Sequence, residues 1–111
     1  MHPKSNSNIN ILKMDHNDIG GPGVMALSEG IAVNKALLSL SLTYCNIDYT
    51  GARAIFEILI YSQSKIKCFN VLGNLEELNL SGNHLRNEGV IVVFRGLSIN
   101  KKLKKIYLAD N

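Results

Sequence analysis

Residues 75–97 read LEELNLSGNHLRNEGVIVVFRGL and contain two hydrophobic periods in succession. Three leucines precede Asn83 with a spacing that favours a short strand ending in a turn. Gly89 is then followed by apolar residues one, four and eight places later, which form one face of a helix. This stretch therefore predicts a strand, a turn and a helix, in that order.

The same pattern recurs along the chain, which has 111 residues. The template L-x-x-L-x-L-x-x-(N/C)-x-L fits residues 9–19, 37–47 and 75–85, and its first nine positions fit 103–111. The residues at the turn position are Asn17, Cys45, Asn83 and Asn111. Their side chains can bond backbone groups that are left unpaired where each strand bends.

The segments between these copies also repeat. A glycine follows the first three turn residues by six places, at Gly23, Gly51 and Gly89. The apolar spacing after each glycine predicts helices at about 22–33, 50–62 and 87–98. Since one unit of about 28 residues cannot bury its apolar face alone, neighbouring units are expected to stack on a shared core.

One interval breaks the period. Residues 66–74 fit the start of the template, but their turn residue Asn74 lies only nine places before Asn83. Nine residues cannot hold a helix that returns the chain to a parallel strand. Either these residues are a loop inserted into one 38-residue repeat, or about 19 residues of a normal unit are missing after Asn74. The strand pattern of IKCFNVLGN favours the second account, with a strand at 67–71.

These observations divide the chain into a polar N-terminal tail and a solenoid. The tail is 1–8, the solenoid is 9–111, and its units are 9–36, 37–65, 66–74 (truncated), 75–102 and 103–111 (incomplete). A strand without a following helix at the C-terminal end predicts a fragment or isoform of a longer repeat protein. It also predicts self-association through that uncapped end.

The stretches LLSLSLTYCNIDYTGARAIFEIL (37–59) and LEELNLSGNHLRNEGVIVVFRGL (75–97) resemble leucine-rich repeats, in particular the long repeats of the ribonuclease-inhibitor-like subfamily. The resemblance implies an α/β horseshoe solenoid, irregular around 66–80, with parallel strands on the concave face and helices on the convex face. Repeats of similar type occur in ribonuclease inhibitors, NOD-like receptors, activators of the Ran GTPase, and ciliary or cytoskeletal scaffolds. The resemblance thus implies a non-catalytic protein-interaction module, with regulation of a small GTPase as an alternative.

The candidate partner-binding residues are the strand positions that are not core leucines. They are Lys13, Asp15, His16, Ser41, Thr43, Tyr44, Asn79, Ser81, Tyr107 and Asp110. On adjacent strands they would stand about 4.8 Å apart and form a polar patch with two tyrosines. Tyrosine is common at interface anchors because it combines apolar area with a hydrogen bond. The alternative is a solvated sheet face that binds no partner.

Motifs for cofactor, metal and acid–base chemistry are weak. The stretch GPGVMA at 21–26 resembles a dinucleotide fingerprint, but only its last glycine recurs in the other units and no acidic ribose partner follows. The three histidines share no metal-ligand spacing. Glu76 and Glu77 are neighbours on a strand and should point to different sides. We therefore expect no enzyme activity, no cofactor, no metal and no small-molecule substrate.

The basic run KKLKK at 101–105 leaves weak RNA binding as a further alternative. The competing interpretation is that Leu103 is a core leucine and the lysines solvate the loop before the last strand. No aromatic residue interleaves the run to stack bases, and the net charge is only +3, so nucleic acid is an unlikely partner. No secretory signal and no 18-residue apolar run are present, which predicts a cytoplasmic protein without a membrane partner; a cytoskeletal or ciliary location is the alternative.

Overall fold

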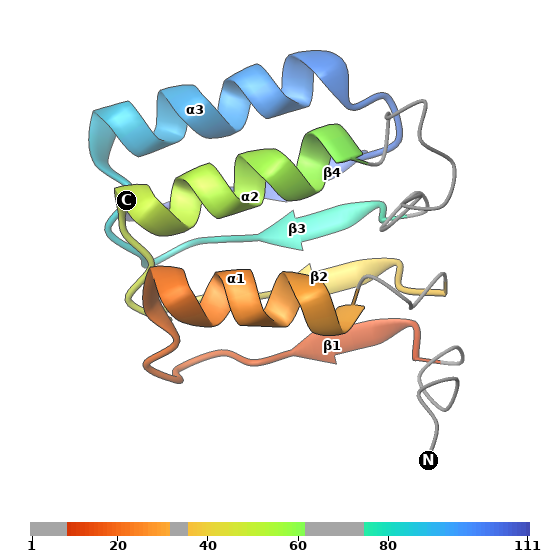
Figure 1. Ribbon diagram of the computed structural model, residues 1–111, viewed down its shortest axis with the longest axis horizontal. Helices are drawn as coiled ribbons and strands as arrows, with labels where there is room; N and C mark the ends of the chain where they lie inside the picture. Colours follow the sequence, from red (N-terminus) through yellow and green to blue (C-terminus); the bar gives the residue numbers. More distant parts are fainter. Residues whose placement is uncertain (1–8, 32–35, 62–74) are drawn as a thin grey trace.

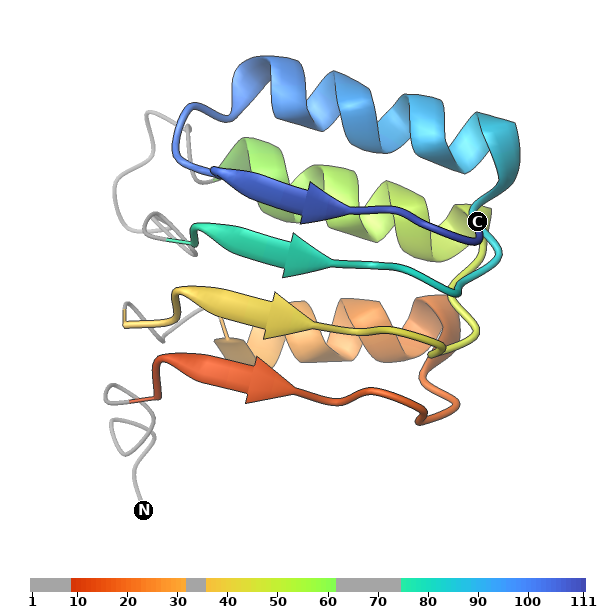
Figure 2. The ribbon, with the colours of Figure 1, turned by 180° about the vertical axis from the view of Figure 1, so that it is seen from behind.

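The computed structural model describes residues 9–31, 36–61 and 75–111, in which strands and helices alternate. The elements are β1 (Ile11–Lys13), α1 (Gly20–Ile31), β2 (Ser39–Ser41), α2 (Tyr49–Tyr61), β3 (Glu77–Asn79), α3 (Arg86–Ile99) and β4 (Lys105–Tyr107). Figure 1 shows the helices α1, α2 and α3 side by side over one face of the sheet. Figure 2 shows the other face, on which none of the helices of the described residues lies. The predicted leucine-rich-repeat architecture is confirmed.

The four strands form one parallel sheet in the order β1-β2-β3-β4. Their register places Leu12, Leu40, Leu78 and Ile106 in one row. The helices α1, α2 and α3 lie on the same face of the sheet, and each belongs to one of the crossover connections that parallel pairing requires. None of the helices in the described residues is long and apolar enough to cross a membrane.

The observed helices begin one or two residues before the predicted starts at 22, 50 and 87. Gly23 and Gly51 lie in the first turn of their helices. The Gly23 N–H donates to the carbonyl of Ile19, and the Gly51 N–H donates to Oδ1 of Asp48. A Cβ on Gly23 would overlap Cγ2 of Ile19, and a Cβ on Gly51 would overlap Cγ2 of Ile47. The recurring glycine is therefore needed because an apolar side chain from the previous turn fills its space. The predicted helix ends at 33 and 62 lie outside the described residues.

The core lies between the sheet and the helices and is continuous through the repeats. Its largest fully buried side chains are Val24, Leu37, Leu40, Leu42, Cys45, Ile47, Ile55, Leu59, Leu78, Leu80, Leu85 and Val93. The outermost strands contribute side chains that are only partly buried, such as Leu12 on β1 and Ile106 on β4. The core side chains are therefore more completely buried in the middle of the sheet than at its two edges.

The turn residues hold successive repeats together. The Asn83 amide oxygen accepts hydrogen bonds from the N–H groups of Cys45 (2.9 Å) and Ile47 (3.0 Å). Its amide nitrogen donates to the carbonyls of Leu42 (2.9 Å) and Leu80 (2.8 Å). The expected backbone-bonding role of the turn residue is thus seen in detail, and it connects one repeat to the repeat before it.

Cys45 fills the same turn position with a thiol. Its Sγ donates to the carbonyls of Met14 (3.1 Å) and Thr43 (3.4 Å). Burial raises the pKa of the Cys45 thiol above its ordinary value, so the thiol keeps its proton for these bonds. A cysteine can therefore replace the amide donor, although it is a weaker partner than asparagine.

The irregular interval is visible in the strand spacing. β2 pairs directly with β3, so the paired residues Leu40 and Leu78 are 38 residues apart in the sequence. The corresponding separations are 28 residues between β1 and β2 and between β3 and β4. Residues 75–80 follow the regular strand pattern. The strand predicted at 67–71, and with it the choice between insertion and deletion, lies outside the described residues.

Candidate functional site

Nine of the ten predicted binding residues line one of two hollowed surfaces, which we call the concave face and the rim. The concave-face hollow has a volume of about 390 Å³ and is lined by Lys13, Asp15, Ser39, Leu40, Ser41, Thr43, Glu77, Asn79 and Tyr107. The rim hollow lies where the strands lead into the helices, and its lining includes His16, Tyr44 and Asp110. Ser81 lines neither hollow, and its Oγ accepts a hydrogen bond from the Ala109 N–H.

Three of the ten residues therefore do not stand on the strand face on which the sequence placed them. His16, Tyr44 and Asp110 follow the strands and adopt left-handed backbone conformations, with φ of 63°, 54° and 59°. That conformation ends the alternation of side chains between the two faces of a strand. The pattern of leucines alone does not reveal it, because non-glycine residues rarely adopt it.

On the concave face, four side chains stand in one row across the sheet. The row is Lys13, Ser41, Asn79 and Tyr107, one residue from each strand. Tyr107 is 45 % exposed and gives one end of the row an aromatic surface. Ile11, two residues before Lys13, is 60 % exposed on β1. The sequence analysis missed Ile11; its alternation with the core residue Leu12 was the available signal.

Asp15 connects the first two repeats on this face. Its Oδ1 accepts hydrogen bonds from Ser41 Oγ (2.7 Å) and from the Thr43 N–H (2.8 Å). Burial acts to raise the pKa of the Asp15 carboxyl, but the bonds from Ser41 and Thr43 outweigh it and hold the pKa below its ordinary value. Asp15 therefore orients Ser41 and Thr43 in addition to presenting charge.

Asp15→Asn is expected to make the free energy of unfolding less dependent on pH in the acid range. The folded-state pKa is lowered from 3.8, so the carboxylate stabilises the fold above that value and loses this contribution as the pH falls through the folded pKa. Because Asp15 is only half-buried, we expect a cost of about 1 kcal/mol at pH 7. Urea unfolding of both proteins between pH 2 and pH 7 measures this. A stability difference that stays constant over this range would contradict the role assigned to Asp15.

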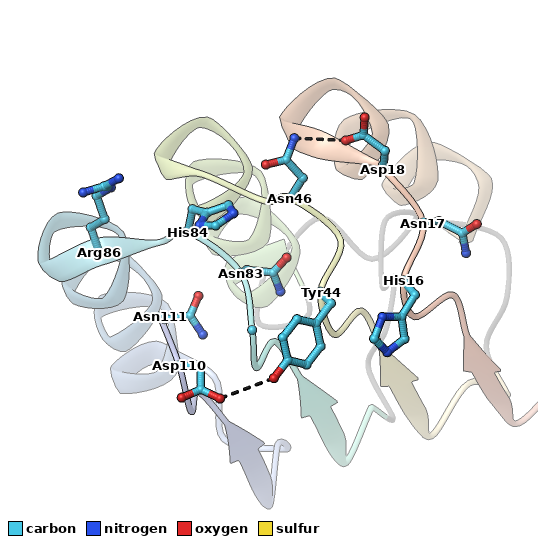
Figure 3. A pocket seen from close by; sticks show the side chains of 11 residues that line it. His16, Asn17, Asp18, Tyr44, Asn46, Asn83, His84, Arg86, Asp110 and Asn111 are labelled. Atoms are coloured by element: carbon cyan, nitrogen blue, oxygen red, sulfur yellow. Dashed lines mark hydrogen bonds between the residues drawn. The ribbon is translucent and has the colours of Figure 1, made fainter.

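The rim is built around the Tyr44 ring, as Figure 3 shows. The His16 ring stacks on it with centroids 5.1 Å apart and planes 4° from parallel. The Tyr44 hydroxyl donates to Asp110 Oδ2 at 3.3 Å. Between these residues lies Gly82, with φ +76°, where a Cβ would overlap the Tyr44 ring. The absence of a side chain at Gly82 thus lets one tyrosine reach from the second repeat to the last.

These four residues are structural equivalents. His16, Tyr44, Gly82 and Asp110 occupy the same place in four successive repeats, by extension of the strand register. All four have a left-handed φ. The sequence analysis nominated three of them singly but missed Gly82, whose signal was its match to the slot of His16 and Tyr44.

The outer part of the rim is polar and carries both signs of charge. Asn46 Nδ2 donates to Asp18 Oδ1 at 3.0 Å, and His84 and Arg86 complete the lining. The rim hollow is broad and open, about 870 Å³ in volume. Asp18, Asn46 and Arg86 were not nominated from the sequence, because no pattern there distinguishes them from other loop residues.

The basic run has partners on the neighbouring strand. Lys104 Nζ lies 3.5 Å from Glu76 Oε2, and Lys105 Nζ lies 3.7 Å from Glu77 Oε2. Both pairs are exposed and contribute little to stability. They nevertheless reduce the positive charge that the run at 101–105 offers to a nucleic acid.

The glycines of the dinucleotide-like stretch serve packing. Gly21 lies against Thr50, where a Cβ would be 2.9 Å from Thr50 Cγ2, and Gly23 lies against Ile19. Within 9–31, 36–61 and 75–111, no group of three or more His, Cys, Asp or Glu side chains could hold a metal ion. The expected absence of a cofactor stays a prediction.

Comparison with known proteins identifies the repeat. The family model described as Leucine Rich repeat matches residues 5–28, 33–56 and 74–94. The human NACHT, LRR and PYD domains-containing protein 13 is 33 % identical over 92 residues, which are 83 % of this chain but 8 % of that protein. The solved structure of Leiomodin-1 Actin-Binding Site 2 superimposes with a TM-score of 0.76 at 18 % identity, covering 98 % of this chain and 58 % of that one.

The chain thus spans a small part of one relative and little more than half of the other. The likeness to the leiomodin structure shows the fold alone, because the sequence identity is low. The ribonuclease-inhibitor-like subfamily stays a prediction. The family match, the parallel sheet and the turn asparagines agree, and the chain belongs to the leucine-rich repeat family.

Proposed function

We propose that this chain is a non-catalytic module that binds a protein partner across its concave face. The observation that carries the proposal is the row of Lys13, Ser41, Asn79 and Tyr107, in which four adjacent strands each present one side chain away from the core. Repeat proteins of this kind use such extended concave surfaces for binding.

The row also suggests the chemistry of the partner. Tyr107 supplies an exposed aromatic anchor at one end. At the other end, Lys13 forms no ion pair with the described residues. Its ammonium group would therefore bind a carboxylate of the partner. Three strand spacings separate them, roughly 14 Å. A partner segment lying across the strands would therefore carry an acidic side chain about four residues from an apolar one.

The test uses the double variant Lys13→Glu/Tyr107→Ala, with Arg53→Glu on helix α2 as a matched control. Proteins captured from a cell extract by the wild-type chain are purified and their affinities measured individually. We expect at least tenfold weaker binding by the double variant, because it loses an aromatic anchor and reverses a charge. The control is expected to bind like the wild type. Equal binding by all three chains, or loss only with Arg53→Glu, would overturn the concave-face assignment.

Two defined partners belong in the same measurement. Purified actin is included because the leiomodin structure of similar fold is named as an actin-binding site. A panel of small GTPases is included because regulation of a GTPase is the alternative function. A hydrolysis rate accelerated by the wild-type chain would replace the proposed role with that alternative. Binding of actin that is lost with the double variant would identify the partner.

A further inference from the structure

A hollow lies between helices α2 and α3, which run side by side in Figure 1. We call it the helix groove. Its volume is about 290 Å³, and its lining is Tyr49, Arg53, Phe56, Val92 and Arg95. In the chain α2 lies between β2 and β3, and α3 lies between β3 and β4. The helix groove is therefore formed by two successive repeats inside the solenoid and does not depend on either edge of the sheet.

The deeper part of the helix groove is apolar. Val92 is buried, Phe56 is half-buried, and Tyr49 is exposed at the surface. Phe56 lies against Gly96 of α3, where a Cβ would be 3.3 Å from its ring, so the two helices approach closely at this point. An apolar side chain from another molecule could therefore cover Phe56 and Val92 and remove apolar surface from water.

Two arginines, one from each helix, flank this apolar surface. Arg53 lies on α2, one turn after Tyr49, and Arg95 lies on α3. The register between β2 and β3 makes Glu57 of α2 the equivalent of Arg95. Arg53 precedes Glu57 by four residues, so the two arginines are displaced by one helical turn, roughly 6 Å along the helix axes.

Neither guanidinium group has a carboxylate partner in the part of the chain that the structure describes. The ion pairs there join Lys104 to Glu76 and Lys105 to Glu77. The segments 1–8, 32–35 and 62–74 contain no Asp or Glu, so they cannot supply a carboxylate either. Glu29 belongs to α1, which lies on the other side of α2 in Figure 1. The charge at the helix groove is thus left for a different molecule to neutralise.

We propose that the helix groove is a second interaction surface, which binds an acidic helical segment of a protein partner. An apolar side chain of that segment would cover Phe56 and Val92, and one carboxylate would bind each arginine. Guanidinium suits this role because its planar fork can donate two parallel hydrogen bonds to a carboxylate. On a helix, glutamates at positions i and i+4 are roughly 6 Å apart along the axis and share one face with a residue at i+3.

The probe is a capped alanine-based peptide with glutamate at positions i and i+4 and phenylalanine at i+3. A second peptide has glutamine in place of both glutamates. Backbone amide chemical shifts of the whole 111-residue chain, recorded during titration, report both the affinity and the surface that is occupied. The variants are Arg53→Glu and Arg95→Glu, with Lys102→Glu as the matched control, because Lys102 is exposed and does not line the helix groove. Thermal unfolding verifies that each variant is folded.

We expect the acidic peptide to shift the amides of α2 and α3 in the wild type and in Lys102→Glu. Either arginine variant, and the glutamine peptide, should bind at least tenfold more weakly. Binding should also weaken between about 0.01 M and about 0.15 M salt, where the Debye length falls from roughly 30 Å to roughly 8 Å.

Three results would overturn the proposal. They are no binding by the wild type at low salt, equal binding by the two arginine variants, and shifts confined to the concave strands. Tighter binding of a single-stranded RNA that is lost in the same variants would replace the acidic segment by phosphate. Because the concave face and the helix groove lie on opposite faces of the sheet, failure of either proposal leaves the other standing.

Discussion

Asn83→Ala is expected to lower the free energy of unfolding by roughly 4 kcal/mol, since the variant leaves the buried N–H groups of Cys45 and Ile47 without an acceptor. It also removes the donor to the Leu42 carbonyl. Asn83 is only 3 % exposed, so water cannot replace these bonds without opening the structure. A domain of this size is stable by about 5–15 kcal/mol, and a loss of this magnitude takes a large part of it.

The matched control is Asn17→Ala. Asn17 occupies the same turn position but is exposed and bonds only the carbonyls of its own turn, so its loss should cost about 1 kcal/mol or less. Urea unfolding followed by circular dichroism measures both variants at low protein concentration. Equal costs for the two substitutions would show that the asparagine does not stabilise the contact between repeats.

Asn83→Asp separates the accepting and donating halves of the amide. A carboxylate oxygen can still accept from Cys45 and Ile47, but the other oxygen would face the carbonyls of Leu42 and Leu80, which are also acceptors. We therefore expect destabilisation as large as that of the alanine variant near neutral pH. A near-neutral effect would mean that acceptance from the two N–H groups supplies almost all of the contribution of Asn83.

Much of the fold could be predicted from the sequence because the pattern for a strand, a turn and a helix recurs in several units. The strand leucines, the turn asparagine and the helix glycine have to agree in phase, and a single coincidence could not imitate that agreement. The structure supplies the physical reason for the helix glycine, which the pattern alone did not. Ile19 and Ile47 each project a methyl group into the space that a Cβ at Gly23 and Gly51 would need.

The rim could not be predicted in the same way. Its organising contact joins Tyr44 to Asp110, 66 residues apart, and depends on a missing side chain at Gly82. The equivalence of these positions is hidden by the 38-residue interval between β2 and β3. Left-handed backbone at His16, Tyr44 and Asp110 adds a change of side-chain direction that strand periodicity does not report. The sequence therefore nominated His16, Tyr44 and Asp110, but it placed them on the strands, whereas they lie in the turns that follow.

Alanine substitutions in the row of Leu12, Leu40, Leu78 and Ile106 test how much each strand contributes to the free energy of unfolding. Leu40 and Leu78 are the buried central members of the row, whereas Leu12 at the edge is only partly buried. Leu40→Ala and Leu78→Ala should each cost about 3–4 kcal/mol, because each removes apolar burial and leaves a cavity between two neighbouring repeats. Leu12→Ala should cost about 1–2 kcal/mol, because Leu12 is only partly buried and, among the described residues, a repeat packs against it on one side only.

These values are to be read from chemical unfolding at low protein concentration, with the three alanine variants measured side by side. Equal costs at the edge and the centre would indicate that β1 is covered as completely as β2, contrary to the partial burial of Leu12.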